Sequence, residues 1–99
     1  MIEKIGRPAM LEQLAEEASE LAQAALKAAR IERGENPTPV TEYDAMKSII
    51  EEYTDVQTCA RELGIESDPE IERRKEVRFY ERYKRMKGEE INGKTKERI

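Results

Sequence analysis

The 99-residue chain contains no histidine, and its only cysteine is Cys59. Without histidine, the chain lacks the usual general base of nucleophilic catalysis and the commonest nitrogen ligand of metal sites. A single cysteine excludes a disulfide within the chain and any site built from several cysteines. We expect Cys59 to be a small packing residue. These absences close most routes to catalysis and leave carboxylates, basic side chains and oxygen-bound metal ions.

Long apolar runs are also missing. No stretch of the sequence approaches membrane-spanning length, and the first residues lack the apolar core of a secretory signal. We therefore expect a cytoplasmic protein that does not interact with membranes. Hydrophobic residues make up 37% of the chain and charged residues 40%. Because so short and polar a chain buries only a thin core, we expect it to assemble as a homodimer or homotetramer.

The charges are unevenly distributed along the chain. Residues 1–69 hold 7 basic and 15 acidic side chains, whereas residues 70–99 hold 11 basic and 7 acidic ones. The first segment can hold cations and the second can attract phosphates. The net charge of −4 argues against non-specific nucleic-acid binding.

Three segments have the periodicity of apolar residues that is typical of helices: about 8–33, about 41–63 and about 69–87. Proline or a capping residue stands at the start of each, and a glycine follows each. No segment alternates as a strand does. We predict an all-α fold, a helical hairpin plus a third helix, with the bundle completed by oligomerisation. Residues 1–88 would form one domain, and residues 89–99 a polar, flexible tail.

The spacing also predicts which residues pack. In the first helix the apolar stripe comprises Leu11, Leu14, Ala18, Leu21, Ala22, Ala25, Leu26 and Ala29. In the second helix it comprises Met46, Ile49, Ile50, Tyr53, Val56, Ala60 and Leu63. The third helix offers Ile71, Val77, Phe79, Tyr80 and Tyr83. Prolines within residues 35–40 predict an extended connector between the first two helices.

An acidic pattern occurs twice, about 35 residues apart, once in each of the first two helices. On a helical wheel Glu17 lies roughly 95°, and Glu52 roughly 80°, from the centre of its apolar stripe. Carboxylates at the edge of a core are costly unless they are paired or bound to metal. Oxygen ligands favour Mg²⁺, with Mn²⁺ as the alternative. The predicted metal ligands are Glu17, Glu20, Glu52 and Asp55.

Simpler explanations exist for both charged regions. Acidic clusters such as this are common on solvated helices, and one copy alone would indicate only polarity. Two copies in register, each at a core edge, favour a site, and we assign Glu16 and Glu51 to the solvated surface. The basic residues of the third helix could likewise be a solvated face. Lys75 and Arg82 lie seven residues apart, on one side of a helix, and are the candidates for binding substrate phosphates.

The paired acidic segments resemble those of the MazG-like branch of the all-α nucleoside triphosphate pyrophosphohydrolases. Residues 14–27 are similar to the first motif helix of that family, and residues 36–40 to the connector of its short phage-type or prophage-type members. The resemblance covers roughly residues 8–83. Phe79 is a departure, because related sequences often carry asparagine there.

This resemblance implies a Mg²⁺-dependent hydrolase that converts a nucleoside or deoxynucleoside triphosphate to the monophosphate and pyrophosphate. It also implies that the four acids hold the metal, that the basic segment from Lys75 to Tyr83 contacts the phosphates, and that the chain assembles as a dimer or tetramer. General chemistry requires a group that accepts the proton of the attacking water, and we assign this role to Glu17 or Glu20. The alternative is a non-enzymatic, small helical oligomer that binds a protein partner or a nucleotide.

Overall fold

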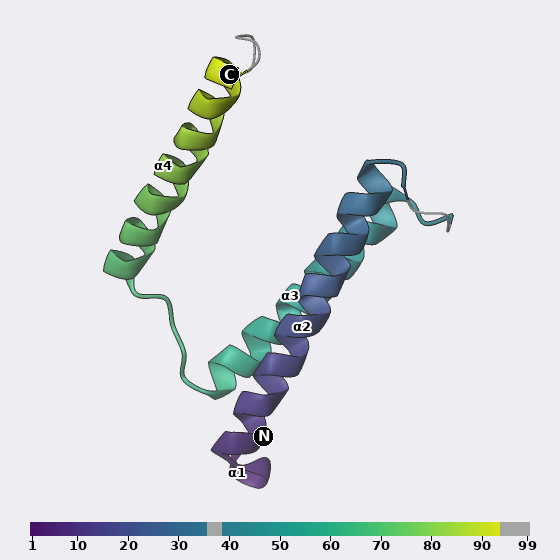
Figure 1. The fold of residues 1–99 in the computed structure, drawn as a ribbon. Helices are drawn as coiled ribbons and strands as arrows, with labels where there is room; N and C mark the ends of the chain where they lie inside the picture. The colour runs from purple at the N-terminus through teal and green to yellow at the C-terminus, as the bar shows by residue number, and fades with distance from the viewer. Residues whose placement is uncertain (36–38, 94–99) are drawn as a thin grey trace. The chain divides into compact units, whose positions relative to one another are not determined.

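The computed structural model describes residues 1–35 and 39–93, with side chains through residue 88 (Figure 1). Every regular element in these residues is an α-helix, which confirms the predicted all-α fold. The chain divides into two compact units, Met1–Glu66 and Ser67–Ile99. The first unit contains three helices and the second contains one: α1 (Ile2–Ile5), α2 (Arg7–Glu32), α3 (Glu42–Glu62) and α4 (Pro69–Gly93).

The helix boundaries follow the capping signals of the sequence. The Thr41 hydroxyl accepts a hydrogen bond from the Asp44 backbone N–H at 3.0 Å, which fixes the start of α3. The Asp68 carboxylate likewise accepts two backbone hydrogen bonds from the first turn of α4, at 2.9 and 3.0 Å. Gly34 and Gly64 follow α2 and α3 with φ of 74°, a conformation that glycine adopts without strain. The three predicted helices are therefore confirmed, with starts and the first two ends within one or two residues.

Two boundaries differ from prediction. The sequence did not predict α1, a single turn that Gly6 separates from α2 with φ of 89°. The predicted end of the third helix at residue 87 is also wrong, because α4 continues through Gly88 to Gly93. One glycine inside a helix costs only about 1 kcal/mol relative to alanine, which is too little to end it. Within the predicted connector, residues 36–38 lie outside the described residues.

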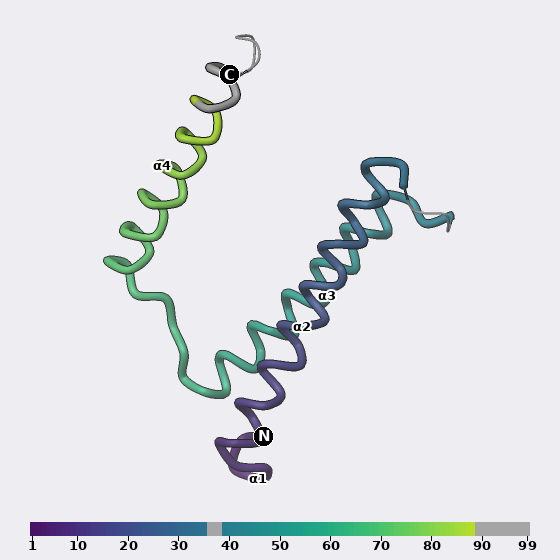
Figure 2. Tube along the Cα trace, viewed as in Figure 1, coloured from purple at the N-terminus to yellow at the C-terminus, as the bar shows by residue number. Residues whose placement is uncertain are grey.

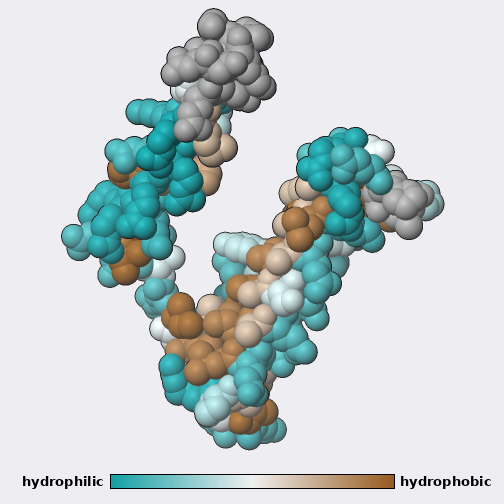
Figure 3. Space-filling model, in the orientation of Figure 1, coloured by the Kyte–Doolittle hydropathy of each residue, from teal (hydrophilic) through white to brown (hydrophobic). Residues whose placement is uncertain are grey.

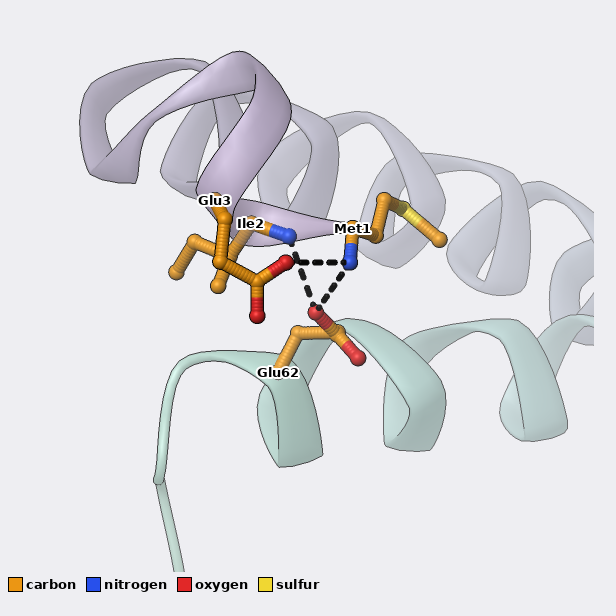
Figure 4. Close-up of polar contacts among 4 residues, drawn as sticks. All are labelled: Met1, Ile2, Glu3 and Glu62. Carbon is orange, nitrogen blue, oxygen red and sulfur yellow. Dashed lines mark hydrogen bonds and ion pairs between the residues drawn. The ribbon is translucent and has the colours of Figure 1, made fainter.

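Polar contacts attach α1 to the end of α3 (Figure 4). One Glu62 carboxylate oxygen accepts a hydrogen bond from the Ile2 backbone N–H at 3.0 Å, and it lies 3.5 Å from the α-amino group of Met1. The same amino group lies 3.2 Å from a carboxylate oxygen of Glu3. These contacts hold α1 beside the apolar core of the first unit, against which Ile2 packs.

Helices α2 and α3 form an antiparallel hairpin (Figures 1 and 2). Met10 near the start of α2 packs with Cys59 and Leu63 at the end of α3, so the helices run in opposite directions. The residues that each helix turns toward the other recur at alternating spacings of three and four, as in a coiled coil. We call these residues the seam. In α2 they are Met10, Leu14, Glu17, Leu21, Ala24, Ala28 and Ile31, and in α3 they are Ala45, Ile49, Glu52, Val56, Cys59 and Leu63.

The predicted packing stripes were therefore partly wrong. Leu26 and Ile50, both expected in the core, are 63% and 59% exposed, and Tyr53 is also exposed. The cause is that contact with one neighbouring helix covers only a narrow strip of the helix surface. The apolar residues that follow each seam position lie outside this strip. The stripes read from the sequence thus combine a buried seam with an open apolar face.

Helix α4 forms the second unit with the residues just before it. Its described side chains, through residue 88, are exposed or half-buried, and none is buried. Phe79 and Tyr80 make an edge-to-face contact with ring centroids 5.6 Å apart. The Lys87 amino group lies 5.6 Å from the centre of the Tyr83 ring. Within its own unit, α4 therefore depends on local contacts and on its cap rather than on a core.

Candidate metal centre

Three carboxylates converge at the middle of the hairpin. Glu17 of α2 and Glu52 of α3 occupy facing seam positions and are half-buried, while Glu20 lies one turn further along α2 and is exposed. One oxygen from each of the three lies within 4.8 Å of the others. This arrangement joins the two copies of the acidic pattern, as the sequence predicted.

The positions of Glu17 and Glu52 correct one sequence inference. Both were expected at the edge of the core face, but both lie in the seam itself. Glu17 stands between Leu14 and Leu21 at spacings of three and four, and the seam follows these leucines rather than the alanines that broadened the predicted stripe. The carboxylates are therefore more deeply placed than their wheel positions indicated.

Asp55, the fourth predicted ligand, is exposed and lies one turn beyond Glu52 on α3. The group of converging oxygens does not include its carboxylate. Aspartate is one methylene shorter than the glutamate that stands at the corresponding position of α2, which reduces its reach. Glu16 and Glu51 are exposed, which agrees with their assignment to the solvated surface.

The cluster concentrates negative charge. Repulsion from Glu17, followed by desolvation and repulsion from Glu52, raises the pKa of Glu20 above its ordinary value. Burial raises the pKa of the nearby Cys59 thiol, and the Glu17 charge adds to this shift. A neutral thiol in the core confirms that Cys59 is a packing residue. Within the described part of the chain, the ion pairs that form lie at Met1 and Arg33, away from these three glutamates.

The two seam carboxylates differ in their hydrogen bonding. The Gln13 side-chain amide donates a hydrogen bond to the Oε2 atom of Glu17 at 2.7 Å. The Oε1 atom of Glu52 is buried and has no hydrogen-bond partner. Sequence reasoning did not identify Gln13. The available signal was its spacing, because a residue four positions before Glu17 lies directly beside it on a helix.

The donor set fits a hard divalent cation. Oxygen ligands alone, with room for water and phosphate, are what Mg²⁺ prefers in proteins. Given metal–oxygen distances of about 2.1 Å, neighbouring ligands of an octahedral Mg²⁺ lie about 3.0 Å apart and opposite ligands about 4.2 Å apart. Small side-chain rotations would bring three oxygens that lie within 4.8 Å of one another to such separations. The buried, unpartnered oxygen of Glu52 is the kind of atom that such an ion would satisfy.

The phosphate-binding candidates lie on α4, and we describe them within that unit. Lys75 and Arg82 border one surface groove together with Ile71 and Phe79. They therefore share a side of the helix, as their seven-residue spacing predicted. Phe79 lies between them on this side.

Within the described residues, no helix is both long enough and apolar enough to cross a membrane. Searches against protein-family models, curated proteins and solved structures found no match for the chain.

Proposed function

We propose that the chain hydrolyses a nucleoside or deoxynucleoside triphosphate to the monophosphate and pyrophosphate in the presence of Mg²⁺. The observation that supports this most is the convergence of Glu17, Glu20 and Glu52 from two helices. Like charges in a half-buried seam destabilise a fold unless a cation neutralises them. The buried oxygen of Glu52, which lacks a donor, adds to this cost.

The chain's own residues suggest a division of roles. Glu17 and Glu52 would hold the cation from the seam. When bound, Mg²⁺ would offset charge on the triphosphate and lower the pKa of a water molecule. Glu20 is exposed at the edge of the cluster, so it is placed to accept a proton from water that attacks the α-phosphorus. Attack there breaks the bond to the β-phosphate and releases pyrophosphate. We assign the base role to Glu20 rather than Glu17 because Gln13 already donates to Glu17.

The α4 helix would supply positive charge for the substrate. Phosphates need cationic partners, and the basic side chains of the chain are concentrated in this helix. Lys75 and Arg82 border the same groove and lie about two helical turns apart, a span that a polyphosphate chain can bridge. We therefore propose that both contact substrate phosphates.

Assembly follows from the open apolar face of the hairpin. Leu11, Ala18 and Ala25 each come one residue after a seam position of α2, and Met46, Ile50 and Tyr53 do so in α3. Because the helices are right-handed and antiparallel, all six positions fall on the same broad side of the hairpin. We call them the apolar face. All are exposed, and Figure 3 shows hydrophobic surface left open on the hairpin.

We propose that a second copy of the chain covers the apolar face and completes a four-helix bundle. The 21 residues of α3 give a length of about 32 Å, and two adjacent helices are about 20 Å wide. The resulting face of roughly 600 Å² approaches the roughly 800 Å² per partner that stable interfaces bury. The alanines allow close helix approach. Glu20 and Asp55 come three residues after seam positions and fall on the opposite side, so this assembly leaves the acidic cluster accessible.

Substitutions at two adjacent residues, one on the apolar face and one outside it, test the proposed assembly. Ala18→Arg places a charge on the apolar face, whereas Ser19→Arg, one residue along, points away from both the seam and that face. We expect Ala18→Arg to sediment as a monomer at micromolar concentration, and Ser19→Arg to match a dimeric or larger wild type. A stably folded wild-type monomer, or an assembly unaffected by Ala18→Arg, would contradict the proposal.

Activity is tested with a panel of ribonucleoside and deoxynucleoside triphosphates in Mg²⁺, with monophosphate and pyrophosphate measured as products. Glu52→Gln should abolish product formation, and Glu51→Gln, the adjacent exposed residue, should retain it. If the wild type forms no product from any member of the panel, the hydrolase proposal is wrong. The open apolar face would then favour the second candidate, a non-enzymatic helical oligomer that binds a partner.

A further inference from the structure

We propose that the groove on α4 binds the base of a nucleotide, with Phe79 as the ring on which the base stacks and Glu76 as the acceptor for an amino group of the base. This inference deepens the proposed function and rests on its phosphate contacts from Lys75 and Arg82. It adds a class of base: cytosine and adenine are favoured over uracil and thymine.

Phe79 presents an aromatic ring at the surface, and a neighbour restricts its position. The ring is 59% exposed and borders the groove. Tyr80 meets it edge-to-face, with ring centroids 5.6 Å apart and ring planes at 79°. An edge-to-face contact occupies at most one face of either ring, so the other face of Phe79 can accept a base. Every base can stack on an aromatic side chain, because every base has a flat π-face.

The charged side chains within about 60° of Phe79 on the helical wheel are sorted by sign. Lys75 and Arg82 lie roughly 40° and 60° to one side, and Glu72 and Glu76 lie roughly 20° and 60° to the other. All four are exposed and border the groove. Among the described residues, no ion pair joins these four charges. The groove therefore offers cations on one side of an open ring and carboxylates on the other.

This arrangement matches a nucleotide better than an apolar partner. A helix packed on Phe79 would withdraw charges of both signs from water, which is costly. A nucleotide instead places its phosphates along the cations, while its base crosses the ring and reaches Glu76. Cytosine and adenine present an amino donor where uracil and thymine present a carbonyl oxygen. A carboxylate accepts a hydrogen bond from the amino group and repels the carbonyl oxygen, which gives the preference.

The chain contains no tryptophan, so one substitution supplies a direct reporter of stacking. Phe79→Trp keeps an aromatic surface in the groove, and a base stacked on the indole quenches its fluorescence. Tyr43→Trp is the matched control, because Tyr43 is 76% exposed and belongs to the first unit. CTP, UTP and inorganic triphosphate are titrated into each full-length protein in EDTA, which prevents Mg²⁺-dependent hydrolysis during the measurement.

We expect CTP to quench Phe79→Trp to saturation and to leave Tyr43→Trp unchanged. Inorganic triphosphate should compete with CTP without quenching, because it has phosphates but no base. UTP should bind about fivefold or more weakly than CTP, and adding Glu76→Met should abolish this difference. In calorimetry on a chain without the reporter, Phe79→Leu should weaken CTP binding about fivefold or more and leave inorganic triphosphate binding unchanged.

Several results would overturn the inference: no quenching at millimolar CTP, equal quenching of both reporters, or CTP binding that Phe79→Leu does not change. An emission maximum typical of a buried indole before nucleotide is added would also overturn it, because protein would then cover Phe79. Equal affinities for CTP and UTP would refute the role of Glu76. If products still form in Mg²⁺, the hydrolase proposal survives these failures. Saturable quenching in a chain that forms no product would instead support the base site and refute the hydrolase.

Discussion

The hairpin and α4 differ in the sign of their charge and in the contacts that stabilise them. Residues 1–66 hold 7 basic and 14 acidic side chains around a seam, and residues 67–99 hold 11 basic and 8 acidic ones. The hairpin buries Met10, Cys59 and Leu63, whereas the described side chains of α4 include no buried one. The seam therefore stabilises the hairpin through contacts between helices. The stability of α4 within its unit depends on its Asp68 cap and its own helix propensity, which leaves an isolated helix marginal in water.

This difference indicates how substitutions should act. In the hairpin, the seam contains both the buried core residues and the half-buried carboxylates Glu17 and Glu52. A substitution at one seam position can therefore change stability, and a substitution at the next can change metal binding. In α4, exposed side chains can change substrate binding with little effect on folding. Four predictions test this separation.

The largest effect is expected in the acidic cluster. Glu17→Gln, Glu20→Gln and Glu52→Gln should each lower kcat/KM for triphosphate hydrolysis at least 100-fold, about 2.7 kcal/mol. Asp55→Asn should cost about tenfold, because its carboxylate lies outside the converging group. Helix content measured by circular dichroism should stay nearly constant, since glutamine keeps the shape and removes repulsion. Full activity in any two of the glutamate variants would refute the proposed roles of these residues.

The second prediction compares packing. Met10 is fully buried, so Met10→Ala should lower the free energy of unfolding by between about 2 and 5 kcal/mol. Phe79→Ala removes a larger side chain, but Phe79 is 59% exposed, and the change should be below about 1 kcal/mol. Urea unfolding of both variants measures the difference. A large loss in Phe79→Ala would show that α4 is part of a packed core in solution.

The sequence was sufficient to predict the three long helices, most of their boundaries and the pairing of the two acidic segments. Capping residues and glycines act locally, so Thr41, Asp68 and Gly64 could be interpreted without tertiary information. The face that each helix buries could not be interpreted in this way. Leu26 and Ile50 continue an apolar stripe as well as Leu21 and Ile49 do, and only the position of the neighbouring helix separates the exposed pair from the seam.

The candidate site shows the same limit. Glu17, Glu20 and Glu52 were identified from their repeat. The place of Glu17 and Glu52 in the seam was not, because exposed apolar residues beside the seam, mainly alanines in α2 and larger side chains in α3, displaced the apparent centre of each stripe. The convergence that excludes Asp55 depends on side-chain length and rotamer. The hydrogen bond from Gln13 to Glu17 is one that helical spacing permits but does not require. Such contacts become visible only once the side chains are placed.

The third prediction concerns the basic side of α4. Lys75→Ala and Arg82→Ala should each lower kcat/KM for triphosphate by about tenfold or more, at least about 1.4 kcal/mol. Lys84→Ala is the control, because Lys84 is exposed and does not border the groove that Lys75 and Arg82 share. None of the three should change the melting temperature appreciably. Equal, small effects from all three would mean that the basic side is only a solvated surface.

The smallest expected effect is a dependence of stability on pH that originates in Glu20. Its pKa is raised in the folded protein, mainly by repulsion from Glu17, so the folded state binds a proton more readily than the unfolded state. The stabilisation from protonation is fully present below the ordinary glutamate pKa of about 4.3 and is lost as pH rises through the raised value. The metal-free protein should therefore gain stability from Glu20 as pH falls toward 5. Saturating Mg²⁺ should reverse the trend, because protons compete with the metal for the same oxygens.

Thermal melts of the wild type and Glu20→Gln between pH 5 and pH 8, with and without Mg²⁺, measure this effect. The wild type minus variant difference isolates Glu20 from the other carboxylates, whose protonation also changes stability. We expect this difference to favour the wild type increasingly at lower pH without metal, and the Mg²⁺-induced rise in melting temperature to shrink over the same range. Parallel melting curves for the two proteins would show that the three carboxylates do not interact in solution. The acids of the hairpin would then be independent charges on a solvated surface.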